Sequence, residues 1–189
     1  MNQRDAFETL AEHTGDELVV TAIGSQTQIW HAVLHRPGNF YLSGPMGHAL
    51  TFGLGLALAR PKERIVAVEG DGGLLMNLGA LAAVAEHRPD NLVVVVMDNL
   101  SYELTGKQPM VNRGRTDFGM LARGFGITAT DAGSPPAVLS EAFRTARGGG
   151  GVSFIWSRLE PMSEKAPSFP HFPYQIKHAF WEHMKTLDA

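Results

Sequence analysis

Two apolar segments, each ending in a polar turn, constrain the fold of this chain more than any other feature. Residues 66–69 lead into the turn GDGG at 70–73, a helical segment follows, and the apolar run 92–97 ends at Asp98-Asn99. This order of strand, glycine turn, helix, strand and polar turn predicts a βαβ unit with parallel strands. Parallel strands end at one edge of their sheet, which is where α/β proteins bind ligands.

The two turns place oxygen ligands at neighbouring strand ends. Asp71 offers a carboxylate and Asn99 a side-chain carbonyl. Hard oxygens of this kind suit Mg²⁺, and glycine amides beside them leave room for phosphate groups. The 28 positions between the two residues (99 − 71) accommodate one crossover helix and one strand. We therefore expect Mg²⁺ to hold a diphosphate at this edge of the sheet.

The remaining segments extend this unit to a doubly wound α/β fold, a six-stranded parallel sheet with helices on both faces. Strands are predicted at 17–23, 40–42, 64–69, 92–97, 126–130 and 152–156, and helices at 2–14, 26–34, 49–59, 74–86, 117–123, 134–147 and 174–184. The helix at 134–147 is expected to begin with Ser134 as N-cap and Pro135 at the first helical position. Residues 1–160 are expected to form one domain, to which the proline-rich connector and final helix of 161–189 also belong.

Composition narrows the class of protein. A length of 189 residues corresponds to about one domain, and a net charge of −3 argues against nucleic acid or an anionic membrane surface as partner. The chain has no cysteine, which excludes disulfides and iron–sulfur ligation by thiolates. No apolar run reaches the roughly 20 residues of a membrane span, and the N-terminus lacks the apolar core of a signal peptide. A cytoplasmic protein is expected.

Three motifs in order carry a resemblance to a known family. They are GPMGHA at 44–49, GDG at 70–72, and Asp98-Asn99 followed by Tyr102 and Thr105-Gly106. Through them, residues 15–160 resemble the thiamine-diphosphate-dependent decarboxylase superfamily, and within it the phosphonopyruvate and sulfopyruvate decarboxylases. A lone GDG is a common turn, but the three motifs together, each after a predicted strand, are specific.

The resemblance implies a diphosphate-binding domain for thiamine diphosphate and Mg²⁺. The metal ligands would be Asp71, Asn99 and the backbone carbonyl of Ser101. The cofactor would contact Gly24, Ser25, Gly44, Met46, Gly70, Asp71, Gly72, Gly73, Asn99, Ser101 and Tyr102. From the residues alone, the turn that starts at Gly24-Ser25 can equally be an ordinary helix N-cap.

The GPMG motif contributes the two candidate catalytic residues, Met46 and His48. In the family, the residue that matches Met46 is an apolar buttress that bends the cofactor, although Met46 could instead be a core residue. The carbonyl that matches Gly44 accepts a hydrogen bond from the aminopyrimidine. His48 could act in proton transfer or bind an anionic substrate, or it could be only a helix-cap residue. Lys107, where the family often has glycine, could add positive charge for an anionic substrate.

The other histidines receive no site in this interpretation. His31 and His35 are expected at the surface, and His171, His178 and His183 show no metal-ligand spacing.

The resemblance also implies a partner. Such a decarboxylase needs a second domain that grips the pyrimidine and supplies an activating glutamate, and this chain is long enough only for the first domain. We therefore expect a separate alpha subunit, an α₂β₂ or larger hetero-oligomer, and no activity of this chain alone. The leading hypothesis is the beta subunit of a nonoxidative 2-oxo-acid decarboxylase that gives an aldehyde and CO₂. Alternatives are a subunit of an acetolactate-synthase-like carboligase, a noncatalytic thiamine-diphosphate-binding subunit, or an oxidoreductase subunit whose clusters lie elsewhere.

Overall fold

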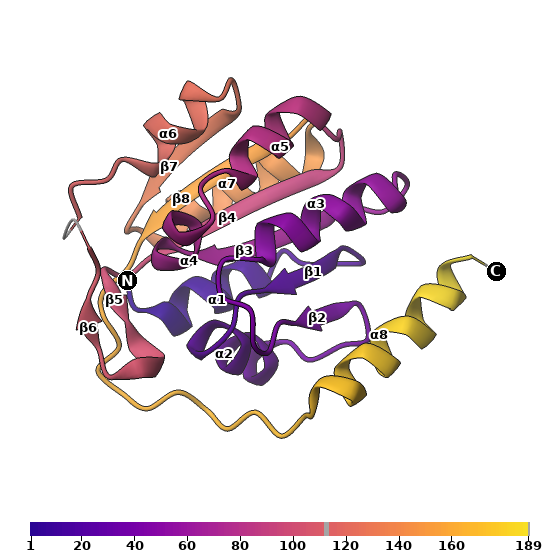
Figure 1. The fold of residues 1–189 in the computed structure, drawn as a ribbon, viewed down its shortest axis with the longest axis horizontal. Coiled ribbons are helices and arrows are strands. Elements are labelled where there is room, and N and C mark those ends of the chain that lie inside the picture. Colours follow the sequence, from indigo (N-terminus) through magenta and orange to yellow (C-terminus); the bar gives the residue numbers. More distant parts are fainter. Residues whose placement is uncertain (112–113, 189) are drawn as a thin grey trace.

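Six parallel strands form the middle layer of the structure, a computed structural model that describes residues 1–111 and 114–188 (Figure 1). Their order across the sheet is β2-β1-β3-β4-β8-β7, and every neighbouring pair is parallel. The strands are β1 (Leu18–Thr21), β2 (Asn39–Tyr41), β3 (Ile65–Gly70), β4 (Leu92–Asp98), β7 (Thr128–Gly133) and β8 (Ser153–Arg158). The predicted six-stranded parallel sheet is confirmed.

The central strands are buried on both faces, which explains their continuous apolar runs. In β4, Leu92, Val94 and Val96 belong to one core cluster. Val93 and Val95 alternate with them and belong to the cluster on the opposite face. Because side chains alternate along a strand, one valine-rich segment serves both cores.

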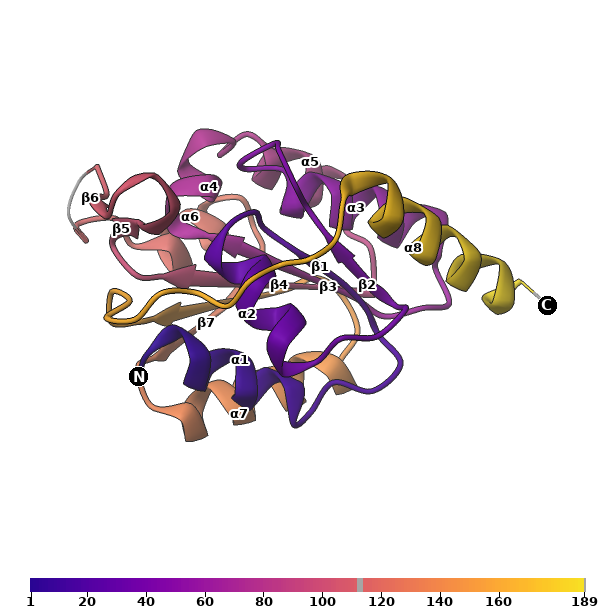
Figure 2. The ribbon, with the colours of Figure 1, turned by 90° about the horizontal axis from the view of Figure 1, so that it is seen from below.

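Helices cover both faces of this sheet (Figure 2). One face carries α1 (Gln3–Ala11), α2 (Ser25–Val33) and α7 (Pro136–Gly148). The other carries α3 (Ala49–Ala59), α4 (Asp71–Met76), α5 (Ala80–His87) and α6 (Phe118–Gly124). The last helix, α8 (Pro173–Leu187), lies along the β2 edge, where the Phe180 ring meets the Phe40 ring at 5.2 Å between centroids. Within the described ranges, no helix is long and apolar enough to cross a membrane.

The single crossover helix predicted at 74–86 is wrong, because the structure has two helices there. α4 begins directly at Asp71 and ends at Met76, and α5 starts at Ala80. Asn77 leaves the helical conformation with φ −129° and ψ 48°. Its side-chain Nδ2 donates a hydrogen bond to the carbonyl of Gly47 at 2.9 Å. The break therefore accompanies a tertiary contact with the turn before α3.

The start of α7 also differs from the prediction by one residue. Pro135 is the N-cap and Pro136 occupies the first helical position. Proline suits that position because its missing N–H has no helical partner there. The residue before a proline prefers an extended backbone, and Pro135 has φ −73° and ψ 130°.

The loop after β4 is a short hairpin rather than irregular chain. β5 (Ser101–Tyr102) pairs with β6 (Gln108–Pro109) in antiparallel fashion, and a 3₁₀ turn at Glu103–Thr105 separates them. The hairpin stands at the carboxyl edge of the sheet, where it fixes the segment that follows Asn99.

The two glycines of α3 face different surroundings. A Cβ on Gly53 would come within 2.7 Å of the Ala67 Cβ in β3, so this glycine lets the helix pack closely on the sheet. A Cβ on Gly55 would meet no atom within 4 Å. Gly55 lies beside Leu58, which is 48% exposed, on an apolar face of the helix that the sheet does not cover.

These surroundings predict opposite effects of the same substitution. Gly53→Ala should lower the free energy of unfolding by about 1–3 kcal/mol, because it forces a methyl group into a filled contact. Gly55→Ala should raise it by up to about 1 kcal/mol, because alanine favours the helix and meets no obstacle. Urea denaturation of both variants measures the difference. A loss of stability from both substitutions would contradict the assignment of Gly55 to an open face.

Candidate functional site

A cavity of about 110 Å³ opens where three strands end. Its wall comes from the turn after β1, the turn after β3, the turn and hairpin after β4, and single residues of other elements. In the sheet, β1 lies between β2 and β3, so the strand that follows β1 in the chain lies on one side of it and the next strand lies on the other. α2 and α4 thus start from adjacent strands and lie on opposite faces, which creates the crevice where doubly wound proteins bind ligands.

The cavity brings together most of the residues predicted for the cofactor. Of the predicted set it is lined by Gly24, Ser25, Met46, Gly70, Asp71, Gly72, Gly73, Asn99, Ser101 and Tyr102. Glu103 and Thr105 of the hairpin also line it.

Asp71 is a buried carboxylate that lines this cavity. Its side chain accepts a hydrogen bond from the Gly72 amide at 2.7 Å and another from the Leu100 amide at 2.8 Å. These bonds hold it between the end of β3 and the turn after β4. Burial, with Asp98 close by, raises the pKa of Asp71 to about 7. A cation at this point would favour the ionised carboxylate.

The two residues at the end of β4 lie in different surroundings. Asp98 accepts a hydrogen bond from the Trp156 indole Nε1 at 3.0 Å and does not line the cavity. Asn99 lines the cavity, and its Oδ1 accepts a hydrogen bond from the Ser101 amide at 3.2 Å. This arrangement fits Asn99 as a ligand of Mg²⁺, and Asp98 as a buried residue beside that ligand.

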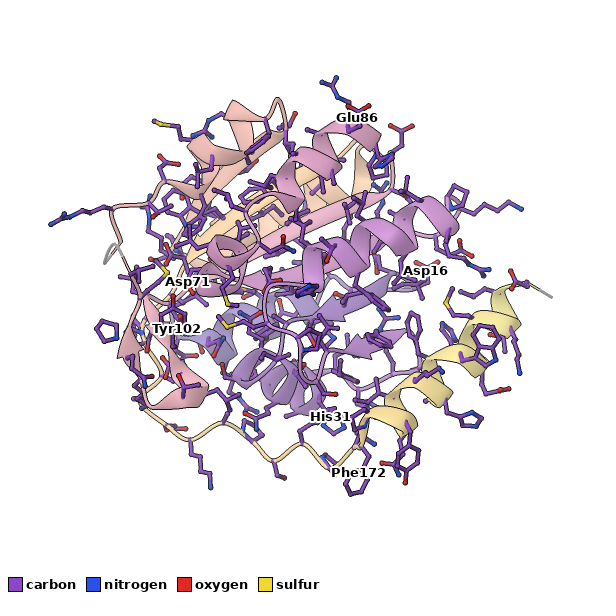
Figure 3. All side chains as sticks on the ribbon, viewed as in Figure 1. Asp16, His31, Asp71, Glu86, Tyr102 and Phe172 are labelled. Carbon is purple, nitrogen blue, oxygen red and sulfur yellow. The ribbon has the colours of Figure 1, made fainter. Side chains whose placement is uncertain are left out.

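The glycines around Asp71 make room for other side chains. A Cβ on Gly70 would approach the Gln26 amide nitrogen to 2.7 Å. A Cβ on Gly72 would overlap the Tyr102 ring, and Figure 3 shows Tyr102 and Asp71 at the same edge of the molecule. A Cβ on Gly73 would overlap the Glu69 carboxylate. A side chain at position 72 or 73 would therefore displace the Tyr102 ring or the hydrogen-bonded Glu69 carboxylate, whereas at position 70 only the flexible end of Gln26 would have to move.

The turn before α3 contributes only part of its motif to the cavity. Met46 is half-buried and lines it, whereas Gly44 and His48 are exposed and are not among the lining residues. The His48 Nδ1 donates to the Met46 carbonyl at 2.8 Å. His48 is the N-cap residue of α3, but its side chain makes no capping bond. The roles predicted for Gly44 and His48 stay predictions.

Lys107 lies beside a second hollow next to the cavity. Its ammonium group donates to the Met162 carbonyl at 2.7 Å, in the connector that precedes α8. In this position it fixes the connector and does not line the cavity at Asp71.

Among the lining residues outside the predicted set are two polar ones, Glu69 and Gln26. Glu69 is 1% exposed and accepts hydrogen bonds from the Ala49 amide at 2.9 Å and the Gly70 amide at 3.0 Å. It thus ties the start of α3 to the end of β3, and burial raises its pKa to about 7. A carboxylate at the last position of an apolar strand is the sequence signal that could have identified it.

Comparison with protein families identifies the family to which this chain belongs. Residues 22–156 match the model described as "Thiamine pyrophosphate enzyme, C-terminal TPP binding domain". The chain belongs to the thiamine pyrophosphate enzyme family. The resemblance expected from the three motifs is confirmed, and the matched span contains the turns after β1, β3 and β4 that form the cavity.

Relatives within this family include one of nearly equal length. The chain is 30% identical to sulfopyruvate decarboxylase subunit beta of Methanococcus maripaludis over 98% of both chains. It is 36% identical to sulfopyruvate decarboxylase of Methanosarcina acetivorans, over the whole of this chain but only 48% of that protein. In fold it resembles the thiamine diphosphate-dependent 4-hydroxybenzoylformate decarboxylase of Rhodococcus jostii RHA1, with a TM-score of 0.72, 20% identity, and coverage of 87% of this chain and 33% of the other. The chain thus spans about half of the Methanosarcina protein and a third of the solved structure.

The residues at the cavity fit the family's cofactor and its metal. Asp71, Asn99 and the Ser101 carbonyl are hard oxygen donors of the kind that binds Mg²⁺. α2 starts at the cavity wall with no side chain capping its N-terminus, so amides there are open to a phosphate group. The buried Gln26 Oε1 has no hydrogen-bond partner in the structure and offers a further polar contact.

Substitutions of Asp71 and Asp98 should show which of the two aspartates is the Mg²⁺ ligand. We expect Asp71→Asn to abolish Mg²⁺-dependent binding of thiamine diphosphate, because it removes the charged ligand. Asp98→Asn, the matched control, should retain binding that is weakened by about 10–100-fold at most, since Asp98 supports the site without lining it. Calorimetric titration of both variants, with circular dichroism to confirm folding, gives the measurement. Equal losses in the two variants would argue against Asp71 as the ligand.

Proposed function

We propose that the chain is the thiamine-diphosphate-binding beta subunit of a two-subunit nonoxidative 2-oxo-acid decarboxylase, of the sulfopyruvate or phosphonopyruvate type. The observation that carries this proposal is the cavity in which Asp71 and Asn99 meet at adjacent strand ends. The full-length similarity to a sulfopyruvate decarboxylase subunit beta supports the choice of substrate class. Both substrates are 2-oxo acids with a second anionic group.

The residues of this chain would bind and orient the cofactor. Asp71, Asn99 and the Ser101 carbonyl would hold Mg²⁺, and the turns at 24–25 and 70–73 would hold the diphosphate. Met46 would support the rings from below, being bulky and adaptable. The Gly44 carbonyl would accept a hydrogen bond from the aminopyrimidine, and His48 would move a proton or meet the substrate anion. Thiamine diphosphate, when bound, supplies the electron sink that decarboxylation of a 2-oxo acid requires.

A partner subunit would complete the site. The cavity of about 110 Å³ is smaller than the roughly 300–1,000 Å³ of typical small-molecule sites. Beside it, Leu104 in the cavity wall is 63% exposed, and Met76 at the end of α4 is 65% exposed. Exposed apolar side chains beside a ligand cavity are typical of a surface that another chain covers. This alpha subunit would supply the activating glutamate within an α₂β₂ or larger assembly, with a cytoplasmic location.

Reconstitution with the partner tests the function directly. This chain alone should release no CO₂ from any 2-oxo acid. Mixed with the product of a neighbouring gene that encodes a pyrimidine-binding domain, it should decarboxylate sulfopyruvate or phosphonopyruvate faster than pyruvate. Headspace CO₂ and product analysis provide the readout. A product with a new carbon–carbon bond would instead indicate a carboligase. If the mixture showed no turnover, the chain would be a noncatalytic thiamine-diphosphate-binding subunit.

Met46 should matter for turnover more than for affinity. In the assembled enzyme we expect Met46→Ala to lower kcat by about 100-fold, because loss of the buttress misplaces the reacting groups. The affinity for thiamine diphosphate should change little, since Mg²⁺ and the diphosphate contacts remain. Met120→Ala is the matched control, because Met120 is 65% exposed on α6 and does not line the cavity. A loss of affinity with unchanged kcat would show that Met46 is not the buttress.

A further inference from the structure

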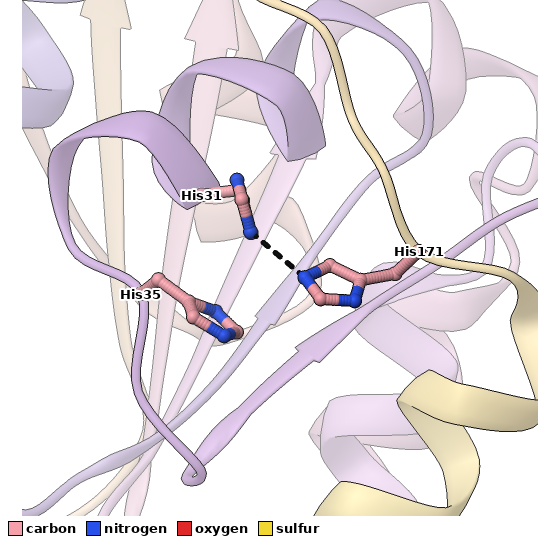
Figure 4. Close-up of side chains that lie close together, drawn as sticks. All are labelled: His31, His35 and His171. Atoms are coloured by element: carbon pink, nitrogen blue, oxygen red, sulfur yellow. Dashed lines mark hydrogen bonds between the residues drawn. The ribbon is translucent and has the colours of Figure 1, made fainter.

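Three histidines from distant parts of the chain converge at the end of α2 that lies away from the cavity (Figure 4). His31 lies in the last turn of α2, His35 follows that helix, and His171 lies in the connector that leads to α8. Each offers one ring nitrogen, and these three atoms all lie within 4.8 Å of one another. The ring centroids are 4.5, 4.9 and 5.2 Å apart.

The contact between two of these rings requires that at least one of them be neutral. The Nε2 atoms of His31 and His171 are 3.0 Å apart, a distance at which one nitrogen donates and the other must accept through a free lone pair. The neutral imidazole is the form that binds metal ions. His35 is exposed, which leaves the cluster open for a metal ion to enter.

A second layer of hydrogen bonds orients one of the rings. The Nδ1 of His35 is 3.0 Å from the Tyr41 hydroxyl, which also accepts a hydrogen bond from Asn39 Nδ2 at 2.9 Å. When His35 Nδ1–H donates to that hydroxyl, its Nε2 keeps the lone pair for a metal ion. Partners of this kind on the far ring nitrogen are typical of metal-bound histidines.

We propose that His31, His35 and His171 form a binding site for a transition metal ion of the Zn²⁺ class. Imidazole nitrogens suit this class, whereas the oxygen ligands at Asp71 suit Mg²⁺. Zn–N bonds of about 2.0–2.1 Å in tetrahedral geometry place ligand nitrogens about 3.3 Å apart. The His31–His171 pair is already close to this separation, and a rotation of side chains brings in the third ligand. Before the metal ion binds, one of these two rings carries a proton on Nε2. When the metal ion binds that Nε2, the proton moves to Nδ1 of the same ring.

The role of the metal follows from the position of His171. His31 and His35 show the H-x₃-H spacing of metal ligands, while His171 lies 136 positions after His35 (171 − 35). One metal ion would therefore fix the connector to α2 and hold the chain that leads into α8. With three protein ligands, the fourth position stays open to water.

The test is a Zn²⁺ titration of the full chain without a polyhistidine tag, after treatment with a chelator and in excess Mg²⁺. We expect saturable binding of one Zn²⁺ per chain, and a tetrahedral Co²⁺ absorption spectrum when Co²⁺ replaces it. His171→Gln should weaken binding by about 100-fold or more, and Tyr41→Phe by about tenfold. His178→Gln is the matched control, because this exposed histidine of α8 lies outside the cluster and its loss should change nothing.

A structural readout accompanies the titration. Zn²⁺ should slow tryptic cleavage after the exposed Lys165 of the connector in the wild-type chain, and should not do so in His171→Gln. If His171→Gln does not fold by circular dichroism, His31→Gln and Tyr41→Phe apply the same test from other elements. The proposal is overturned if the wild-type chain shows no saturable binding, if His171→Gln binds like the wild type, or if His178→Gln loses as much affinity.

Discussion

The burial of the Asp71 carboxylate is the constraint on which the site depends. A buried charge is costly unless hydrogen bonds or an opposite charge compensate it, and Asp71 is only 4% exposed. Two backbone amides, of Gly72 and Leu100, supply part of the compensation and simultaneously fix the turn after β4 to the end of β3. The neighbouring Asp98 acts in the opposite direction, since it raises the pKa of Asp71. Such a pair of acidic residues is stable with a divalent cation beside it, which is the chemistry that Mg²⁺ brings to this family's cofactor.

Close packing around the glycines gives the cavity its shape. The Glu69 carboxylate occupies the space that a side chain at Gly73 would fill, and it also bonds the first amide of α3. A Cβ on Gly47, which has φ 77°, would come within 2.7 Å of the Gly73 carbonyl. Asn77 then bonds Gly47 from the end of α4. The turn that presents Met46 is thereby locked to the helix that begins at Asp71, and a protein interior of this density transmits any change at one position to the other.

The sequence predicted those features that depend on local pattern, and it failed where distant side chains decide the structure. Strand positions followed from apolar runs, and the meeting of Asp71 with Asn99 followed from the rule that parallel strands end at one edge. The break at Asn77 could not be predicted, because it depends on a hydrogen bond to Gly47, 30 positions earlier. The same holds for the histidine cluster, since His31 and His171 are 140 positions apart in sequence. Glu69 was missed although a carboxylate at the end of an apolar strand was a usable signal, and Gln26 was missed because only the structure shows that it faces the cavity.

The connector before α8 links the two sites physically. At its start, the Met162 amide donates to the Glu103 carboxylate at 2.9 Å, and Lys107 donates to the Met162 carbonyl. Glu103 also accepts a hydrogen bond from Asn99 Nδ2 at 3.4 Å, so the chain of contacts reaches the expected Mg²⁺ ligand. At its end, His171 meets His31 on α2, whose opposite end forms part of the cavity wall. The hairpin, the connector and α2 thus form a closed loop of contacts, in which fixing His171 restricts the connector that holds Glu103. Fixing the histidine cluster should for this reason also reduce motion at the cofactor cavity. The two lie at opposite ends of α2, which is about 14 Å long.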